Sequence, residues 1–575
     1  MSVARATYLW LALALTTALA YLWGLDGLNI PKFGDEMVYA HIARKTAESG
    51  HWLPLQSDYG HMRNTKPPLL FWQAMVAGQW GADWRLGALR LPSVIYTWAT
   101  ALISALLAAR LWRERSEASR QEGRALMSPM MAGATAATAW LLFFSTIRYN
   151  RTYLTSGPET FWMFGVMAAL AWAPSRRLAS RLWFPLAAGV ATGLACLYKS
   201  FVLVVPVGFA ILLCHLWAHE RGVQPRLSAG TLATTAFKLA ISSLLALAIF
   251  SLWFALDPQP SEIWREFVVG ENVGRITGGP GYLSVAFGAD SGLWIILVAC
   301  FSNGGLLLPV IVGAAIAALQ AAWRGERISA GEKVLWLWIL ALTLFFMVPS
   351  QRTSRYLVPA MPAVAILMAL YWQRIHRGWF LASACLAAAV IALMGVIAWG
   401  GALATADGGL YSPAFWVLLS LLIASAIAAF AVPRLTPICS LTAVLGVLLA
   451  MTGVYAPFNS TIGQFEPQAV QALQGQTVAA AYQFTGQTER YSFLLPGVKI
   501  QHVQMQPART TAELGRLLGD ARYAIVQDEA ACRPCRVVAS RWEPGNRPGA
   551  GAMDALLRPE NYWFVREYIV ERTGP

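Results

Sequence analysis

Charged residues are scarce in this chain of 575 residues: Lys, Arg, Asp and Glu together make up only 13%, about half the share found in ordinary globular proteins. A soluble chain of this length would fold into several domains whose surfaces are covered by charge, so the shortage excludes a soluble protein. It also excludes a disordered chain and a coiled coil, which are both rich in charge. Because 57% of the residues are apolar, the chain must fold mainly in hydrocarbon.

Cysteine is scarce as well, with seven residues. Five lie within apolar runs, where a thiol behaves as a small apolar group. The other two form Cys532-Arg-Pro-Cys535 near the C-terminus. We favour a disulfide here, because we place this segment outside the membrane in an oxidising compartment. A thioredoxin-like redox motif needs a βαβ context that the segment does not show, and zinc needs further ligands.

Basic residues exceed acidic ones by 14. In a soluble protein this excess would indicate nucleic-acid binding, but in a membrane protein it is typical of topology signals or of attraction to anionic lipid. We therefore expect a membrane, and no nucleic acid, as the partner of this chain.

Apolar runs long enough to span a bilayer recur along the chain and predict a polytopic α-helical membrane protein with about 13 transmembrane helices. The predicted spans are 7–23, 88–109, 127–147, 159–173, 183–198, 201–218, 232–256, 291–320, 334–349, 357–372, 379–400, 414–431 and 438–455. If the N-terminus is cytoplasmic, the inside segments carry more than twice as many Lys and Arg as the short outside segments. This asymmetry follows the positive-inside rule and predicts a cytoplasmic N-terminus.

Three outside segments are larger than connectors need to be. The first loop, 24–87, is predicted to carry amphipathic helices, and the loop 257–290 is predicted to be flexible because it is rich in glycine. The tail, 456–575, alternates short apolar runs with a helix-like segment and predicts a small α/β domain. We therefore divide the chain into a membrane part, 1–455, and an outside domain, 456–575.

The first loop contains Gly34-Asp35-Glu36, followed by interleaved apolar and polar residues up to Glu48. This pattern predicts a helix that lies along the membrane surface with two carboxylates at its N-terminus. Helix capping alone would explain those carboxylates. A carboxylate at the edge of a membrane cavity could also act as a general base or hold a metal ion. The residues leave both interpretations open.

Further polar residues border the predicted spans on the outer side. Two prolines restrict Lys66 to an extended backbone, and either interfacial snorkelling or phosphate binding accounts for its ammonium group. Ser156-x-x-Glu159 has the spacing of a capping box. Lys199 lies alone between two apolar runs, so it either snorkels or meets an anion.

Several cations lie on the outer side of the predicted membrane, where the positive-inside rule disfavours them. They are Lys66, Lys199, Arg275, Arg352 and Arg355. Cations placed there indicate an anionic, phosphate-bearing substrate at the outer leaflet. The residues alone thus predict a membrane protein that handles a lipid phosphate, with carboxylates nearby.

Five motifs follow one another within residues 1–400: Gly34-Asp35-Glu36, Thr65-Lys66-Pro67-Pro68-Leu69, Lys199-Ser-Phe, Glu271-Asn-x-x-Arg275 and Arg355-Tyr356-Leu-x-Pro-x-x-Pro. Their order resembles that of the polyprenyl-phosphate-sugar-dependent glycosyltransferases of the protein-O-mannosyltransferase clan. Within that clan the chain is most similar to the 4-amino-4-deoxy-L-arabinose lipid A transferases of Gram-negative bacteria.

The resemblance implies a C-type glycosyltransferase fold in the bacterial inner membrane, with the active site on the periplasmic side. It implies transfer of a sugar from undecaprenyl phosphate to a phosphate oxygen of lipid A, without a nucleotide. Asp35 would be the catalytic carboxylate and Glu36 its neighbour in the motif. The substrate-binding residues implied are Lys66, Lys199, Arg275, Arg63, Tyr39, Glu159, Arg352, Arg355 and Tyr356.

Two departures from the family pattern bear on the acceptor and on metal binding. Members often carry an Asp in the second outside loop, where this chain has Ser156 and Gly157, so either Glu159 supplies the acid or no acid is needed there. The loop after Arg275 also lacks the usual His-x-x-Pro-aromatic continuation. A divalent metal ion is therefore left open. So are two alternative functions: a related transferase that acts on a protein or another glycan, and a lipid transporter.

Overall fold

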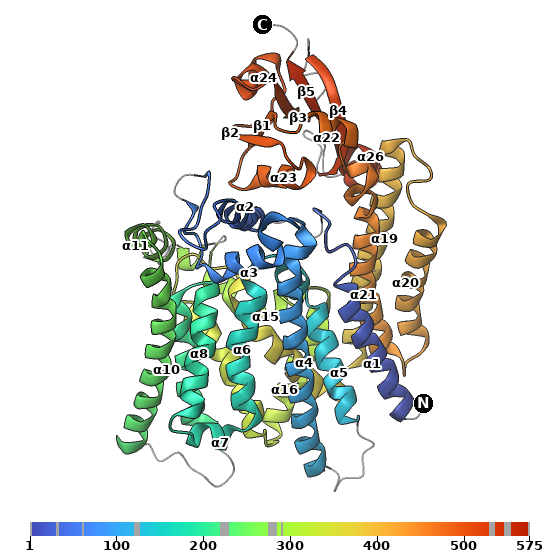
Figure 1. Cartoon of the computed structure of the whole chain (residues 1–575). Helices are drawn as coiled ribbons and strands as arrows, with labels where there is room; N and C mark the ends of the chain where they lie inside the picture. The colour runs from blue at the N-terminus through green and yellow to red at the C-terminus, as the bar shows by residue number, and fades with distance from the viewer. Residues whose placement is uncertain are drawn as a thin grey trace.

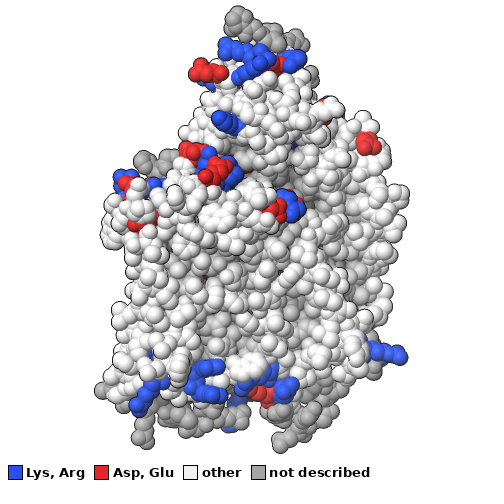
Figure 2. Space-filling view, in the orientation of Figure 1, with Lys and Arg blue, Asp and Glu red and all other residues white. Residues whose placement is uncertain are grey.

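The computed structural model describes residues 3–29, 34–59, 62–119, 127–218, 229–273, 285–288, 291–527, 535–545 and 554–572. Figure 1 shows a bundle of long helices below and a small sheet above, with the N-terminus at the far end of the bundle from the sheet. Charged side chains gather at the two ends of the molecule in Figure 2, and the surface between them is almost free of charge. This uncharged band is what a lipid-facing surface requires.

The helices of the bundle coincide with the predicted spans. Their bounds are α1 (Val3–Ala20), α4 (Leu86–Ser119), α5 (Pro129–Leu142), α6 (Ser156–Trp172), α8 (Trp183–Tyr198), α9 (Val204–Trp217), α10 (Ala229–Leu256), α16 (Leu308–Trp323), α17 (Ala330–Phe346), α18 (Met361–Tyr371), α19 (Arg377–Thr405), α20 (Pro413–Ala431) and α21 (Thr436–Tyr455). Within the described residues, eight helices are long and apolar enough to cross a membrane. The figure of about 13 crossings stays a prediction.

One predicted span is broken. The run 291–320 contains the short helices α14 (Leu293–Leu297) and α15 (Ala299–Ser302) before α16 begins at Leu308. Gly305 between them has a φ of +58°, a left-handed conformation that interrupts a helix and that glycine adopts without steric cost. Irregular backbone at this depth is tolerated because protein covers it: the Ser145 amide, for example, donates to the Asn303 carbonyl.

The C-terminal region folds into the predicted α/β unit. Its sheet contains β1 (Thr477–Tyr482), β2 (Lys499–Gln504), β3 (Tyr523–Val526), β4 (Cys535–Pro544) and β5 (Phe564–Arg572), in the order β2-β1-β3-β5-β4. The first three strands are parallel, and β5 pairs antiparallel with both β3 and β4. Helix α24 (Thr511–Leu518) begins with a capping box formed by Thr510 and Glu513. The short apolar runs of the tail form β1 and β3, and its helix-like segment forms α24.

Cys535 in β4 is disulfide-bonded. The other cysteines of the described residues, all in the membrane part, carry free thiols. This agrees with the predicted bond between Cys532 and Cys535, although Cys532 itself lies outside the described residues.

Helix α2 (Gly34–Glu48) forms where the amphipathic pattern predicts it, but it is not an exposed surface helix. It lies between the bundle and the C-terminal sheet (Figure 1), and most of its side chains are buried. The cause is a set of contacts that the periodicity could not reveal. Glu489 of the C-terminal region accepts hydrogen bonds from His41 and Arg44 and so brings that region down onto α2.

Two further outside segments border the same end of the bundle. The first loop continues into α3 (Leu69–Ala77), which packs against α2 and α4. The second loop forms α11 (Pro260–Ile263) and a π-helical stretch, η6 (Trp264–Val273). Its glycine-rich part, predicted to be flexible, lies outside the described residues, and so does Arg275.

Candidate active site

The two carboxylates at the start of α2 point to different places. Glu36 is fully buried, whereas the Asp35 side chain is 51% exposed. Consecutive residues of a helix are rotated by about 100° from one another, so only one of the two can face a given cavity. The motif therefore contains one carboxylate that is available to a ligand and one that is not.

Glu36 forms a buried ion pair with Arg90 of α4. The Arg90 guanidinium donates from Nε and Nη2 to the two Glu36 oxygens, both at 2.7 Å. Arg90 also donates to the carbonyls of Leu25 and Gly27, and the Tyr153 amide donates to Glu36 Oε1 at 2.7 Å. Every charge in this group is matched, as burial demands. Glu36 thus fastens the first turn of α2 to the bundle.

Asp35 lines a cavity of about 360 Å³ at the outer end of the bundle. Its Oδ2 accepts a hydrogen bond from Arg355 Nη1 at 3.0 Å. Arg355 lies in the 3-10 turn η8 (Ser354–Ala360), donates from Nε to Ser156 Oγ at 3.1 Å, and stacks over the Tyr149 ring. The guanidinium is held on three sides, so its position beside Asp35 is fixed by the bundle.

Lys66 enters the same cavity from the first loop. Its ammonium group donates to the Thr65 carbonyl at 2.7 Å and lies 3.3 Å from Glu271 of η6. The extended backbone that Pro67 imposes on Lys66 directs the chain back toward α3. The ion pair links the first outside loop to the second across the cavity.

Lys199 enters from the end of α8, at the C-cap position. Its Nζ lies 2.8 Å from both oxygens of Glu159 and 5.3 Å from the centre of the Tyr356 ring. Glu159 is 1% exposed, so its charge is balanced within the protein by this lysine. Lys199 therefore meets an anion in the resting structure and does not snorkel.

The predicted capping box at the start of α6 is wrong. The N-terminus of this helix has no side-chain cap. Ser156 instead accepts the hydrogen bond from Arg355, and Glu159 binds Lys199. The spacing was correct for a cap, but two cations from distant parts of the chain compete for the same side chains.

The structure thus brings most of the predicted residues together. The cavity is lined by Asp35, Val38, Tyr39, Met62, Thr65, Lys66, Tyr149, Thr155, Lys199, Glu271, Thr353, Arg355 and Tyr356. A second hollow of about 580 Å³ adjoins it and shares Met62, Thr65 and Glu271 with it. Three cations and two carboxylates line the first cavity and form a polar site at the membrane border.

Other predicted residues lie outside the cavity lining. Glu36 is held by Arg90, and Glu159 acts through Lys199. Arg63 donates to Gln259 in the second loop, and Arg352 is buried on the carbonyls of Met347 and Ser291. Arg275 lies outside the described residues.

The residues alone did not indicate Arg90, Tyr149 or Thr353. Arg90 stands within an apolar run, and an ionisable residue there is itself a sign of a buried partner. Tyr149 lies in the π-helical turn Thr146–Asn150, a type of turn frequent at functional sites. Neither signal shows which residue supplies the partner, because the contacts join segments far apart in the sequence.

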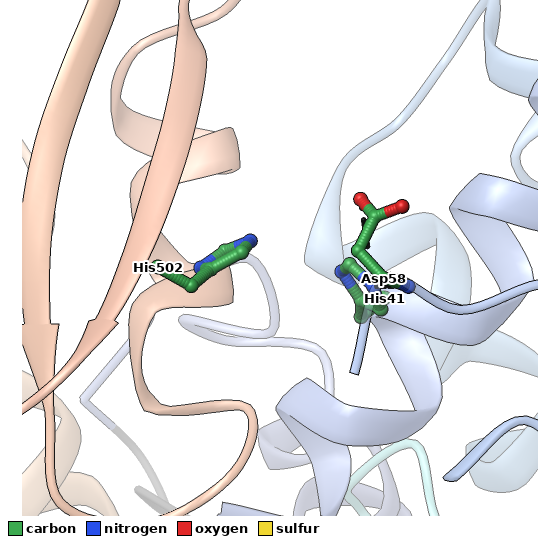
Figure 3. A group of neighbouring side chains, drawn as sticks. All are labelled: His41, Asp58 and His502. Carbon is green, nitrogen blue, oxygen red and sulfur yellow. Dashed lines mark hydrogen bonds and ion pairs between the residues drawn. The ribbon is translucent and has the colours of Figure 1, made fainter. Parts of the chain in front are cut away.

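Among the described residues, the side chains close enough together to bind one metal ion do not line the cavity. His41, Asp58 and His502 bring three ligand atoms within 4.8 Å of one another, between α2, the first loop and the C-terminal sheet (Figure 3). In the cavity, Asp35 and Glu271 are the carboxylates that line the wall. A divalent ion there stays a prediction.

No protein-family model matches the chain. It is 28% identical over 368 residues to the undecaprenyl phosphate-alpha-4-amino-4-deoxy-L-arabinose arabinosyl transferase of Pseudomonas aeruginosa, a match that covers 62% of this chain and 58% of that protein. It is 27% identical over 373 residues to transferase 1 of the same description from Sodalis glossinidius, with 64% and 59% covered. The aligned region thus spans less than two thirds of these relatives.

The fold is also found in a solved structure. The crystal structure of ArnT from Cupriavidus metallidurans bound to undecaprenyl phosphate matches with a TM-score of 0.59 and 17% identity, over 98% of this chain and 99% of that one. The predicted fold class, a helical multi-pass membrane protein with a small C-terminal α/β unit, is therefore confirmed. The resemblance to aminoarabinose transferases is confirmed by these similarities.

Proposed function

We propose that this chain transfers 4-amino-4-deoxy-L-arabinose from undecaprenyl phosphate to a phosphate oxygen of lipid A. The observation that supports this most strongly is the cavity itself, in which an exposed Asp35 faces Lys66, Lys199 and Arg355. A sugar phosphate donor needs cations for its phosphate, and a transfer reaction needs a carboxylate beside the acceptor. The relatives and the matching crystal structure bear names of this activity and this donor lipid.

The cations would receive the donor phosphate. Lys66 and Lys199 are each paired with a carboxylate in the resting structure, at 3.3 Å from Glu271 and 2.8 Å from Glu159. An entering phosphate would take over hydrogen bonds from these ammonium groups, whose charges the two carboxylates otherwise balance. Each ammonium has three N–H donors, so it can hold a phosphate oxygen without releasing its carboxylate entirely.

The chemical step moves the sugar between two phosphate oxygens. An oxygen of the lipid A phosphate attacks the anomeric carbon, the bond from that carbon to the undecaprenyl phosphate oxygen breaks, and its electron pair stays on the departing phosphate. The cations offset that added negative charge, as preorganised donors do in other transfer reactions. Asp35 would accept the proton from the acceptor phosphate, with Arg355 orienting its carboxylate.

The arrangement of the two ends of the bundle supports a particular orientation in the membrane. We propose that the chain lies in a bacterial inner membrane with a cytoplasmic N-terminus, a periplasmic cavity and the region 456–575 in the periplasm. Helix α2, whose Asp35 lines the cavity, and the C-terminal sheet lie at one end of the bundle, and the N-terminus lies at the other (Figure 1). Residues 1–455 would form the membrane transferase part.

Lipid A mass spectrometry tests the proposal directly. The chain is expressed in a Gram-negative strain that lacks its own aminoarabinose transferase but still makes the lipid-linked donor, with an empty vector as control. We expect a pentosamine mass increment on lipid A in the expressing strain only. If lipid A is unmodified although the protein is present in the membrane, the acceptor assignment is wrong.

A further inference from the structure

Three potential metal ligands meet where the C-terminal sheet rests on α2. His41 comes from α2, Asp58 from the first outside loop and His502 from β2. In Figure 3 the His502 ring points from the sheet toward His41 and Asp58. Their ligand atoms lie within 4.8 Å of one another. Three segments that are distant in the sequence thus place two imidazoles and a carboxylate around one point, away from the residues that line the cavity.

His41 is oriented as metal-binding histidines are. Its ring is fully buried, and Nδ1 lies 2.8 Å from Glu489 Oε2. The opposite nitrogen, Nε2, faces Asp58: it accepts a hydrogen bond from the Asp58 amide at 3.0 Å and lies 4.0 Å from Oδ2. In metal-binding histidines, a carboxylate bound to one ring nitrogen fixes the tautomer of the ring and directs the other nitrogen toward the metal.

Glu489 is suited to this orienting role. Its side chain is fully buried, and its two oxygens accept hydrogen bonds from His41 Nδ1 and from Nε and Nη2 of Arg44. These hydrogen bonds hold the carboxylate in place and so fix the direction in which the His41 ring faces.

His502 is also held through one nitrogen. Its Nδ1 lies 2.6 Å from Thr488 Oγ1 and 3.4 Å from the Tyr59 hydroxyl, which leaves Nε2 for another ligand. The Tyr59 ring packs against both imidazoles, with ring centres 4.4 Å from His41 and 4.9 Å from His502.

We propose that His41, Asp58 and His502 bind Zn²⁺, or a similar transition-metal dication, and that this ion fastens the C-terminal sheet to α2. Two imidazoles and one carboxylate suit zinc, whereas Ca²⁺ and Mg²⁺ prefer oxygen ligands throughout. Ligand atoms around a tetrahedral zinc are about 3.3 Å apart, so the group would close by at most about 1.5 Å. A water molecule would complete the four ligands.

Two existing contacts would give way to the ion. The Asp58 amide would lose its hydrogen bond to His41 Nε2, and Lys45, now 2.8 Å from Asp58 Oδ2, would be replaced as the counter-charge of that carboxylate. Lys45 and zinc therefore compete for Asp58. Removal of the Lys45 ammonium group should therefore strengthen zinc binding.

The test measures zinc binding to the full chain, purified in detergent without a polyhistidine tag and treated with a chelator. Zn²⁺ is then titrated against a chromogenic chelator. We expect one tightly bound equivalent for the unmodified protein and at least tenfold weaker binding for His502→Ala and Asp58→Asn. Lys45→Met should bind zinc more tightly, because the competing ammonium group is gone.

Two controls separate this site from others. His51→Ala removes an exposed histidine of the same loop that is not part of the group, and Asp35→Asn removes a cavity carboxylate; both should bind zinc as the unmodified protein does. Zinc should also raise the unfolding temperature of the unmodified protein and not that of His502→Ala. The proposal is overturned if the unmodified protein binds no stoichiometric zinc, or if His502→Ala and Asp58→Asn bind it equally well.

Discussion

Asp35 and Glu36 are neighbours in the sequence and carry the same charge, yet each pairs with an arginine in a different environment. Glu36 and Arg90 are both 0% exposed and share two hydrogen bonds. Arg355 Nη1 donates a hydrogen bond to Asp35 Oδ2 at the wall of a cavity, and half of the Asp35 side chain is exposed. The first pair is sealed from solvent, whereas the second can exchange partners.

In a membrane protein, a sealed pair of this kind holds the fold, whereas a half-exposed pair can serve a ligand. Removing one member of a buried pair leaves an unmatched charge in a medium that cannot solvate it. An exposed pair contributes little to stability, because water replaces the lost partner. Substitutions at adjacent positions should therefore separate folding from activity.

The largest effect is expected for Glu36→Gln. The buried Arg90 guanidinium would lose the carboxylate that now matches its charge. The expected cost is about 3–5 kcal/mol in the free energy of unfolding. Thermal unfolding of the detergent-purified protein measures this loss, and the yield of monodisperse protein should fall with it. Asp35→Asn is the matched control and should unfold at nearly the original temperature. Equal unfolding temperatures for the two variants would show that the comparison is mistaken.

A smaller effect is expected for Lys66→Met. Losing a charge-assisted hydrogen bond to a phosphate costs about 1.5–3 kcal/mol, or about 10- to 100-fold in the dissociation constant of undecaprenyl phosphate. A binding titration with that lipid in detergent checks it. Lys45→Met, which removes a lysine from α2 outside the cavity lining, should bind the lipid normally. Unchanged binding by both variants would indicate that Lys66 only pairs with Glu271.

The smallest effect is expected for Arg63→Ala. Arg63 contacts Gln259 and Glu262 in the second loop and does not line the cavity. The transfer rate and the lipid affinity should each stay within about twofold of the original, as is usual for a partly exposed polar contact. A loss comparable to that of Lys66→Met would place the donor site across both loops and not in the cavity alone.

The sequence predicts the membrane fold well, because hydrocarbon and hydrogen-bond satisfaction leave few choices. The apolar runs predict where the bundle helices form, and the alternating runs of the tail predict β1 and β3. The sequence does not show how the helices are interrupted or which segments pack on one another. The break at Gly305 and the cover over α2 depend on neighbours that arrive from other parts of the chain.

The site could be predicted only in part for the same reason. An unusual cation such as Lys199 is visible in the sequence, but its partner Glu159 is 40 residues away. The spacing of Glu159 from Ser156 predicts a helix cap instead. The Asp35-Glu36 motif marks the right turn of the right helix. It does not reveal which of the two faces the cavity, because that depends on Arg90 and Arg355.

The most direct measurement compares Asp35→Asn with the unmodified protein, both purified, with donor lipid at saturation and lipid A as acceptor. We expect sugar transfer to fall by about 100- to 10,000-fold, the usual contribution of a general base. The affinity for undecaprenyl phosphate should change little, because the ammonium groups that would hold the phosphate remain. Transfer by Asp35→Asn at the original rate would contradict the role assigned to the cavity carboxylate.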